Sequence, residues 1–97
     1  MTTCRWIGTA SGHEGEADYA DNYEPSGVPV DGDTLVLANT SQSLNAGDLD
    51  LSAVTLALLE IHQTFTGEVG NAAEYLKIGA TTVRIGRYDG TGNPAGS

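Results

Sequence analysis

The chain has 97 residues, of which 39% are hydrophobic and 18% charged, and this size and composition suit one small folded domain and leave no room for a two-domain enzyme. Thirteen acidic residues face four basic ones, and the net charge of −9 argues against nucleic acid and anionic membranes as partners, because Lys and Arg drive both kinds of binding. The longest apolar stretch, residues 54–59, is far shorter than the roughly 20 residues of a membrane helix.

The start of the chain gives no targeting signal, since residues 1–6 lack the basic end and the apolar run of a signal peptide. The single cysteine, Cys4, cannot form a disulfide within the chain, which fits synthesis in a reducing compartment. We therefore expect one acidic, glycine-rich domain over residues 1–97 that is only marginally stable by itself.

The first predicted element is an acidic loop over residues 11–32. Its glycines and prolines set turns and interrupt helices and strands. Tyr19 and Tyr23 predict that the loop is ordered, with the rings packed on the body of the domain and the hydroxyls in water. Its acidic residues, with no Lys or Arg among them, are Glu14, Glu16, Asp18, Asp21, Glu24, Asp31 and Asp33.

Short strands follow the loop. Residues 34–38 predict a buried strand after a turn. Residues 54–65 favour a strand over a helix, because β-branched and aromatic residues recur and the period from Leu59 onward is two. Two more strands are predicted at 75–78 and 82–85, where apolar residues alternate with Lys77 and Arg84 on the outside. The residues expected inside are Leu76, Ile78, Val83 and Ile85.

Glycine-containing corners separate these strands, at 67–71 and 79–81. Short inward-alternating strands with small-residue corners are typical of a parallel β-solenoid, in which each strand stacks on its equivalent in the next coil. The predicted fold class is therefore all-β: a short right-handed parallel β-solenoid, β-helix-like, with a long N-terminal acidic loop. The alternative is a small antiparallel β-sandwich, which tight two-residue hairpin loops between adjacent strands would have favoured. The glycine-rich tail, 86–97, is expected to be flexible or bound to a partner.

No metal site is predicted from the possible ligands. His13, His62 and Cys4 have no ligand spacing, and both histidines are expected to be solvated. The pairs Asp31/Asp33 and Asp48/Asp50 offer carboxylates one residue apart, but a calcium site needs about six or seven oxygens. Turn formation is the preferred interpretation of both aspartate pairs.

No catalytic site and no cofactor are predicted either. Glu14, Glu16 and Asp18 lack the neighbours that would separate the proton affinities of two carboxylates. The glycine-rich segments 12–15 and 91–96 lack the lysine and the strand-to-helix context of a phosphate-binding loop. No Ser-His-Asp or Cys-His arrangement has supporting context, so we expect no enzyme activity.

Three aromatic residues give an alternative function. Trp6, Tyr19 and Tyr23 would form a stacking platform for sugar rings in a carbohydrate-binding or adhesive module. The preferred interpretation is that Trp6 anchors a small core and that the tyrosines hold down the loop.

A resemblance to a known family covers nearly the whole chain. The opening motifs are Trp6-Ile7-Gly8, Asp21-Asn22-Tyr23 and the segment from Val28 to Leu37. They resemble the start of a family of bacteriophage and prophage virion proteins, and of some bacterial surface β-helix proteins. The shared pattern is a Trp-x-Gly, an Asn followed by an aromatic residue, and a Pro-x-x-Gly-Asp before the first strand. The second half is similar to the phage proteins at residues 50–56, 65–70 and 75–80.

The resemblance implies a non-enzymatic structural role on a virus particle, as a capsid decoration or head-fibre component, with a place in the tail as the less favoured alternative. It implies the major capsid protein as partner, a homo-oligomer with a trimer favoured, and a place on the capsid surface after synthesis in the cytoplasm of the bacterial host. Association would also cover the open strand edges and apolar side chains at the ends of a short solenoid.

Overall fold

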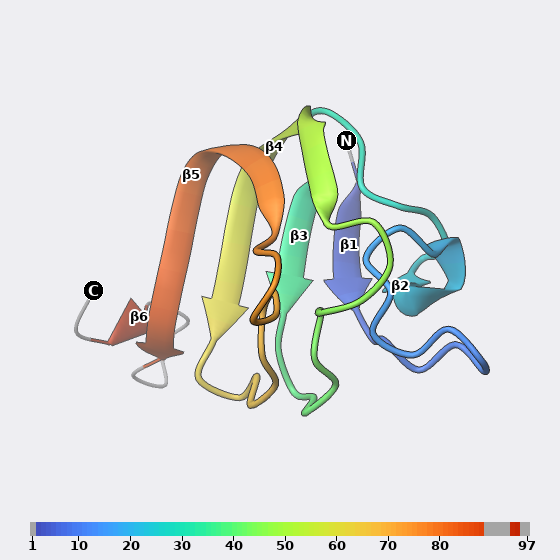
Figure 1. Cartoon of the computed structure of the whole chain (residues 1–97). Helices are drawn as coiled ribbons and strands as arrows, with labels where there is room; N and C mark the ends of the chain where they lie inside the picture. Colours follow the sequence, from blue (N-terminus) through green and yellow to red (C-terminus); the bar gives the residue numbers. More distant parts are fainter. Residues whose placement is uncertain (1, 89–93, 96–97) are drawn as a thin grey trace.

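The computed structural model describes residues 2–88 and 94–95, and this part of the chain is mostly β. The strands are β1 (Thr3–Trp6), β2 (Tyr23–Glu24), β3 (Thr34–Leu37), β4 (Asp50–His62), β5 (Lys77–Tyr88) and β6 (Pro94–Ala95). They form one open, mixed sheet in the order β2-β1-β3-β4-β5-β6 (Figure 1). The helical structure among the described residues is a single 3₁₀ turn, η1 (Ala20–Asn22). The all-β prediction is therefore confirmed.

The four central strands are parallel. β1 pairs with β3, β3 with β4, and β4 with β5 in parallel, whereas β2 and β6 join antiparallel. The alternative of an antiparallel β-sandwich is therefore wrong. Thr34 pairs with Leu58, and Leu58 pairs with Thr82, so equivalent positions of β3, β4 and β5 follow one another at a constant spacing. Within the described residues, no helix is long and apolar enough to cross a membrane.

Strands β4 and β5 both bend over one end of the molecule, drawn at the top of Figure 1. Their pairing shifts register between Leu51 and Thr55, and the first residues of each strand run in front of the sheet that the later residues join (Figure 1). The two strands predicted at 75–78 and 82–85 are therefore parts of one bent region, with Lys77 to Tyr88 assigned as a single strand. Gly79 lies where an added Cβ would come within 3.2 Å of the Val54 carbonyl oxygen, which explains the small residue at the predicted corner.

Return segments follow β1, β3 and β4 and lead to the next strand. Isolated parallel bridges join them, between Glu16 and Ala46, between Thr40 and Phe65, and between Leu44 and Val69. The core lies between these segments and the sheet. Its fully or almost fully buried apolar residues are Cys4, Trp6, Ala17, Tyr23, Leu35, Leu37, Leu44, Leu49 and Leu56. The partly buried residues packed against them include Leu59, Ile61, Leu76 and Ile78, on the side that the alternation predicts.

The predicted burial of Val83 and Ile85 is wrong, because their side chains are 50% and 60% exposed. Their register partners on β4 are Leu59 and Ile61, so they do stand on the core side of the sheet. In the described part of the chain, no return segment runs in front of Val83 and Ile85. Their side chains therefore remain exposed to water.

The predicted flexible or partner-bound tail, 86–97, falls largely on residues that are not described. Residues 89–93 and 96–97 of the predicted tail lie outside the described residues. Gly86 to Tyr88 continue β5, and the short strand β6, which the sequence did not predict, pairs with residues 87–88.

Leu37 and Ile85 occupy equivalent places two strands apart, because Leu37 pairs with Ile61 and Ile61 with Ile85. Leu37 is 1% exposed, so Leu37→Ala is expected to lower the free energy of unfolding by about 2–5 kcal/mol. Ile85→Ala, at a 60% exposed position, is expected to cost less than about 1 kcal/mol. Urea unfolding followed by circular dichroism, at the lowest workable protein concentration, measures both. Equal losses would contradict the uncovered position of Ile85.

Candidate functional site

The acidic loop is organised around the buried side chain of Asn22. Its Nδ2 donates to the carbonyl oxygens of His13 at 2.8 Å and Glu16 at 2.9 Å, and its Oδ1 accepts from the backbone N–H of Ala10 at 2.9 Å. One amide therefore satisfies two carbonyl groups of the loop and the N–H of the residue just before it, and these groups would otherwise be costly to bury.

Two elements inside the loop were missed by the sequence analysis. η1 and β2 lie within residues 11–32, and β2 pairs with the outer edge of β1 at Trp6–Tyr23 and Arg5–Glu24. They are too short for a local pattern to reveal them. The signal in the sequence for these elements was the Asp21-Asn22-Tyr23 motif, whose Asn22 and Tyr23 are both buried.

Trp6 and Tyr23 lie in the core, with 0% and 1% of their surface exposed. Their ring centroids are 5.2 Å apart in an edge-to-face arrangement. Trp6 Nε1 donates to the Gln42 carbonyl oxygen at 2.9 Å, and the Tyr23 hydroxyl donates to the Ala17 carbonyl oxygen at 2.7 Å. The preferred interpretation of these two rings is confirmed, but the expectation that the Tyr23 hydroxyl stays in water is wrong. Burial, followed by the nearby Cys4 and Asp18, raises the pKa of Tyr23.

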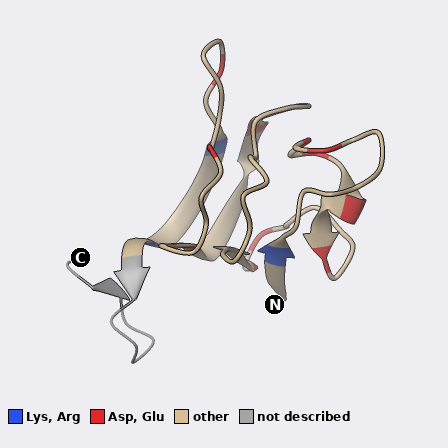
Figure 2. Cartoon of the chain, turned by 90° about the horizontal axis from the view of Figure 1, so that it is seen from below, with Lys and Arg blue, Asp and Glu red and all other residues tan. Residues whose placement is uncertain are grey.

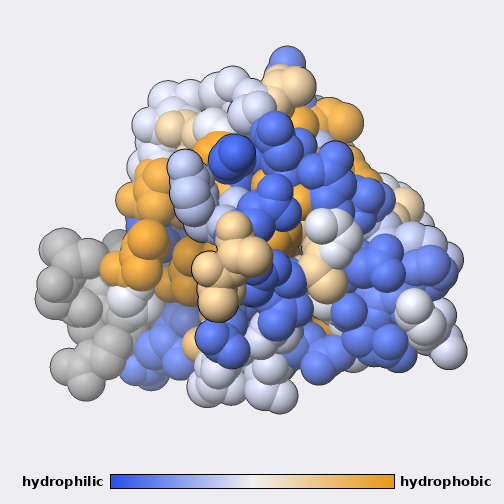
Figure 3. Space-filling view, viewed as in Figure 1, coloured by the Kyte–Doolittle hydropathy of each residue, from blue (hydrophilic) through white to orange (hydrophobic). Residues whose placement is uncertain are grey.

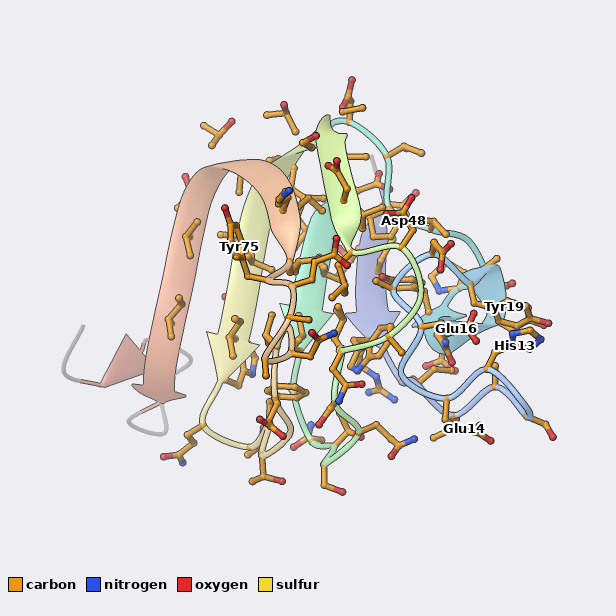
Figure 4. The ribbon with its side chains drawn as sticks, viewed as in Figure 1. His13, Glu14, Glu16, Tyr19, Asp48 and Tyr75 are labelled. Atoms are coloured by element: carbon orange, nitrogen blue, oxygen red, sulfur yellow. The ribbon has the colours of Figure 1, made fainter. Side chains whose placement is uncertain are left out.

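His13 and Tyr19 stack on each other at the loop, with centroids 3.8 Å apart and planes 7° from parallel (Figure 4). His13 Nδ1 also lies 3.2 Å from Glu16 Oε2. The sugar platform suggested by the sequence is not assembled, because Trp6 and Tyr23 are buried and one face of Tyr19 is against His13. The expectation that both histidines are solvated is wrong as well, since the Nε2 atom of His62 is buried.

An open polar groove of about 240 Å³ lies beside the loop. It is lined by Glu14, Gly15, Ser41, Gln42, Ser43 and Asn45. The Gln42 amide donates to the Gly8 carbonyl oxygen at 2.8 Å, and the Ser43 hydroxyl accepts from the Glu68 N–H at 2.9 Å. These polar groups therefore connect neighbouring segments of the fold.

Asp33 fastens the N-terminal strand from a buried position. It accepts the backbone N–H groups of Thr2 and Val30, each at 3.0 Å, and the Sγ of Cys4 lies 3.7 Å from it. The hydrogen bond from Val30 is the largest of the effects that lower the pKa of Asp33. Burial first, and then the charge of Asp33, raise the pKa of the Cys4 thiol.

The turn role predicted for Asp31 and Asp48 is confirmed. Asp31 lies in a turn in which the Asp33 N–H donates to the Val30 carbonyl oxygen at 3.1 Å, and Asp48 accepts the Asp50 N–H at 3.0 Å. The Asp31 side chain also accepts the Thr55 N–H of β4 at 2.8 Å. Asp50 accepts both the hydroxyl and the N–H of Ser52, which lower its pKa. Across residues 2–88 and 94–95, no three His, Cys, Asp or Glu side chains gather closely enough to hold a metal ion.

The two ends of the sheet differ in charge. Residues 12–34 carry seven acidic and no basic side chains, whereas residues 50–88 carry four acidic and three basic ones. Figure 2 shows Asp and Glu gathered around the loop and β2. At the other end, Arg84 Nη1 on β5 lies 3.7 Å from Glu60 Oε2 on β4. The loop end is therefore strongly negative, and the β5 end is close to neutral.

Apolar surface gathers at the neutral end. The described large hydrophobic residues that are exposed are Val30, Val69, Tyr75, Val83 and Ile85. Val83 and Ile85 stand on β5, and Tyr75 lies beside this strand (Figures 3 and 4). We name these three residues the β5 face. A surface of this kind binds other apolar surface, and it is the candidate functional site.

No protein family model matches the chain, and no match is found among the curated proteins or the solved structures. The function of the chain is therefore inferred from its own geometry and from the motif resemblance.

Asn22 and Asn71 make the same kinds of side-chain hydrogen bond, since the Asn71 Nδ2 donates to the Asn45 carbonyl oxygen and its Oδ1 accepts two backbone N–H groups. Asn22 is 0% exposed, whereas Asn71 is exposed to water. Asn22→Asp is expected to destabilise the fold by about 3 kcal/mol or more, because a buried carboxylate cannot donate to the carbonyl oxygens it would face. Asn71→Asp is the matched control and is expected to cost about 1 kcal/mol or less. Chemical denaturation at neutral pH measures both, and similar losses would rule out the role given to Asn22.

Asp33 makes stability depend on pH. Because its pKa is lowered in the folded protein, its contribution is complete above the unfolded-state pKa of about 3.9 and is lost as pH falls through the folded value. Asp33→Asn is expected to cost about 1–3 kcal/mol at pH 7, where it weakens charge-assisted hydrogen bonds. The difference from wild type is expected to shrink between about pH 5 and pH 2. Thermal melts across this range test the trend, with exposed Asp31→Asn as control. A difference that is constant with pH would contradict it.

Proposed function

We propose that the chain is a non-enzymatic virion structural protein that decorates or stabilises the outside of a phage capsid and is built as a short right-handed parallel β-solenoid. The observation that carries this proposal is the exposed β5 face at one end of a sheet whose other end is closed by β2. A small protein with exposed apolar side chains at one end buries them by association. Association is the property that a particle component requires.

The spacing of the strands supports the solenoid. β3, β4 and β5 repeat at intervals of 24 residues, from Thr34 to Leu58 to Thr82. The bridges from Thr40 to Phe65 and from Leu44 to Val69 repeat at 25 residues. Nearly equal repeats in both the strands and the return segments are what stacked coils produce. The right hand follows from the strong preference of parallel crossover connections.

The hydrogen bonds of the acidic side chains support a structural role over a catalytic one. Asp33 and Asp50 are the described carboxylates whose pKa is lowered, and both accept hydrogen bonds from nearby groups of the chain. Acid/base catalysis instead uses groups whose proton affinities are moved towards the working pH. In the described residues, these carboxylates stabilise turns and the first strand.

On a capsid, the acidic loop end and the apolar β5 end of the protein would have different roles. The motif resemblance implies the major capsid protein as partner and assembly of the chain with copies of itself. The acidic loop faces solvent in this arrangement, because ordering it on a partner would cost conformational entropy, and its charge keeps particles apart by repulsion. The apolar end lies within the assembly.

Particles purified with and without this protein test the virion role. We expect mass spectrometry to detect the chain in wild-type particles and electron microscopy to show extra density on the outside of the head. Absence of the chain from purified particles would remove the proposal.

A charge variant tests the orientation of the loop. Replacing Glu14, Glu16 and Asp18 together with Ser is expected to leave occupancy on particles unchanged at both low and high salt, because a loop that faces solvent makes no attachment contact. Attachment by rim charges would weaken as the Debye length falls to about 3 Å near 1 M salt. Loss of the variant from particles at low salt would show instead that the loop is the attachment element.

A further inference from the structure

We propose that the β5 face is the contact between two copies of this chain, which meet face to face about a two-fold axis. This inference does not rest on the virion role, since it concerns the isolated protein. Along one row of side chains on the core side of the sheet, burial is lost towards β5. Cys4, Leu35, Leu59 and Val83 are successive register partners on β1, β3, β4 and β5. Cys4 and Leu35 are 3% and 1% exposed, and Val83 is 50% exposed.

The surface that best matches the β5 face is the β5 face of a second copy of the chain. Among the described residues, five large hydrophobic side chains are exposed, and Tyr75, Val83 and Ile85 are three of them. Among the described residues, the opposite end exposes less apolar surface, because β2 closes it, Trp6 and Tyr23 are buried there, and Val30 is the large hydrophobic residue of the acidic loop that is exposed. Stacking head to tail would therefore set apolar side chains against an acidic, polar end. A contact between identical patches is a two-fold contact, and it closes after two copies.

The distribution of charge along the chain also favours contact through the β5 ends. Residues 12–34 hold seven acidic and no basic residues. Two copies that approach by their loop ends bring two of these negative segments together. Residues 50–88 are nearly balanced, and Arg84 on β5 already pairs with Glu60. Like charges facing each other disfavour an interface, so repulsion opposes the loop ends and leaves the β5 ends free to meet.

Sedimentation velocity of the full chain tests the proposal. We expect a dimer whose fraction rises with concentration between about 1 and 100 µM. Ile85→Glu is expected to raise the dimer dissociation constant at least tenfold, roughly the effect of losing one central interface residue. Val30→Glu is the matched control, because Val30 is 61% exposed and Ile85 is 60% exposed, and it is expected to leave the dimer unchanged. Circular dichroism of both variants checks that they are folded.

Cross-linking gives a second readout that does not depend on weakening the contact. Under mild oxidation, Val83→Cys is expected to form a disulfide-linked dimer, whereas Val30→Cys is not; Cys4 is buried in both. A wild-type chain that is monomeric at 100 µM would overturn the proposal, and so would a trimer. A dimer that Ile85→Glu does not weaken and Val83→Cys does not link would place the contact elsewhere and also overturn it.

Discussion

Parallel, in-register pairing is the constraint on which the rest of this structure depends. It sets equivalent side chains of successive strands in rows on one side of the sheet, as with Leu35, Leu59 and Val83. Each row needs a second segment in front of it, because apolar side chains on an open pleat remain in water. The return segments supply that cover for β1 and β3, and Leu44, Leu49 and Leu56 complete the core. Burial therefore declines along the sheet from the first strands to β5.

The first end of the sheet is closed by polar chemistry rather than by further apolar residues. Thr3 pairs with Thr34, a spacing of 31 residues, whereas Thr34 to Leu58 is a spacing of 24. The longer first segment contains η1 and β2, which cover the outer edge of β1. Asn22 makes this possible because it satisfies carbonyl and N–H groups that the closure buries. The exposed ion pair of Arg5 with Glu24 contributes little beside it.

Local alternation predicted the strands well and the extent of burial less well. The period of two identified the core side of β5 and of the second half of β4 correctly, but it reports the side of the pleat and not whether another segment covers that side. Val83 and Ile85 are therefore on the predicted side and yet exposed. Asn22 was missed because a polar residue in an acidic loop resembles a solvated one. The turn aspartates and the core position of Trp6 were predictable because each follows from a single residue type in its immediate context.

Charge and burial are arranged in opposite directions along the sheet, and this arrangement limits the ways in which the molecule can associate. The end closed by β2 holds most of the acidic residues, where water can solvate the exposed loop that carries them. The β5 end holds Val83 and Ile85, with the nearby charge of Arg84 matched by Glu60. An apolar surface attracts without direction, so the bare β5 face would by itself accept many partners. The negative charge at the far end adds selectivity, because it opposes any contact between two loop ends.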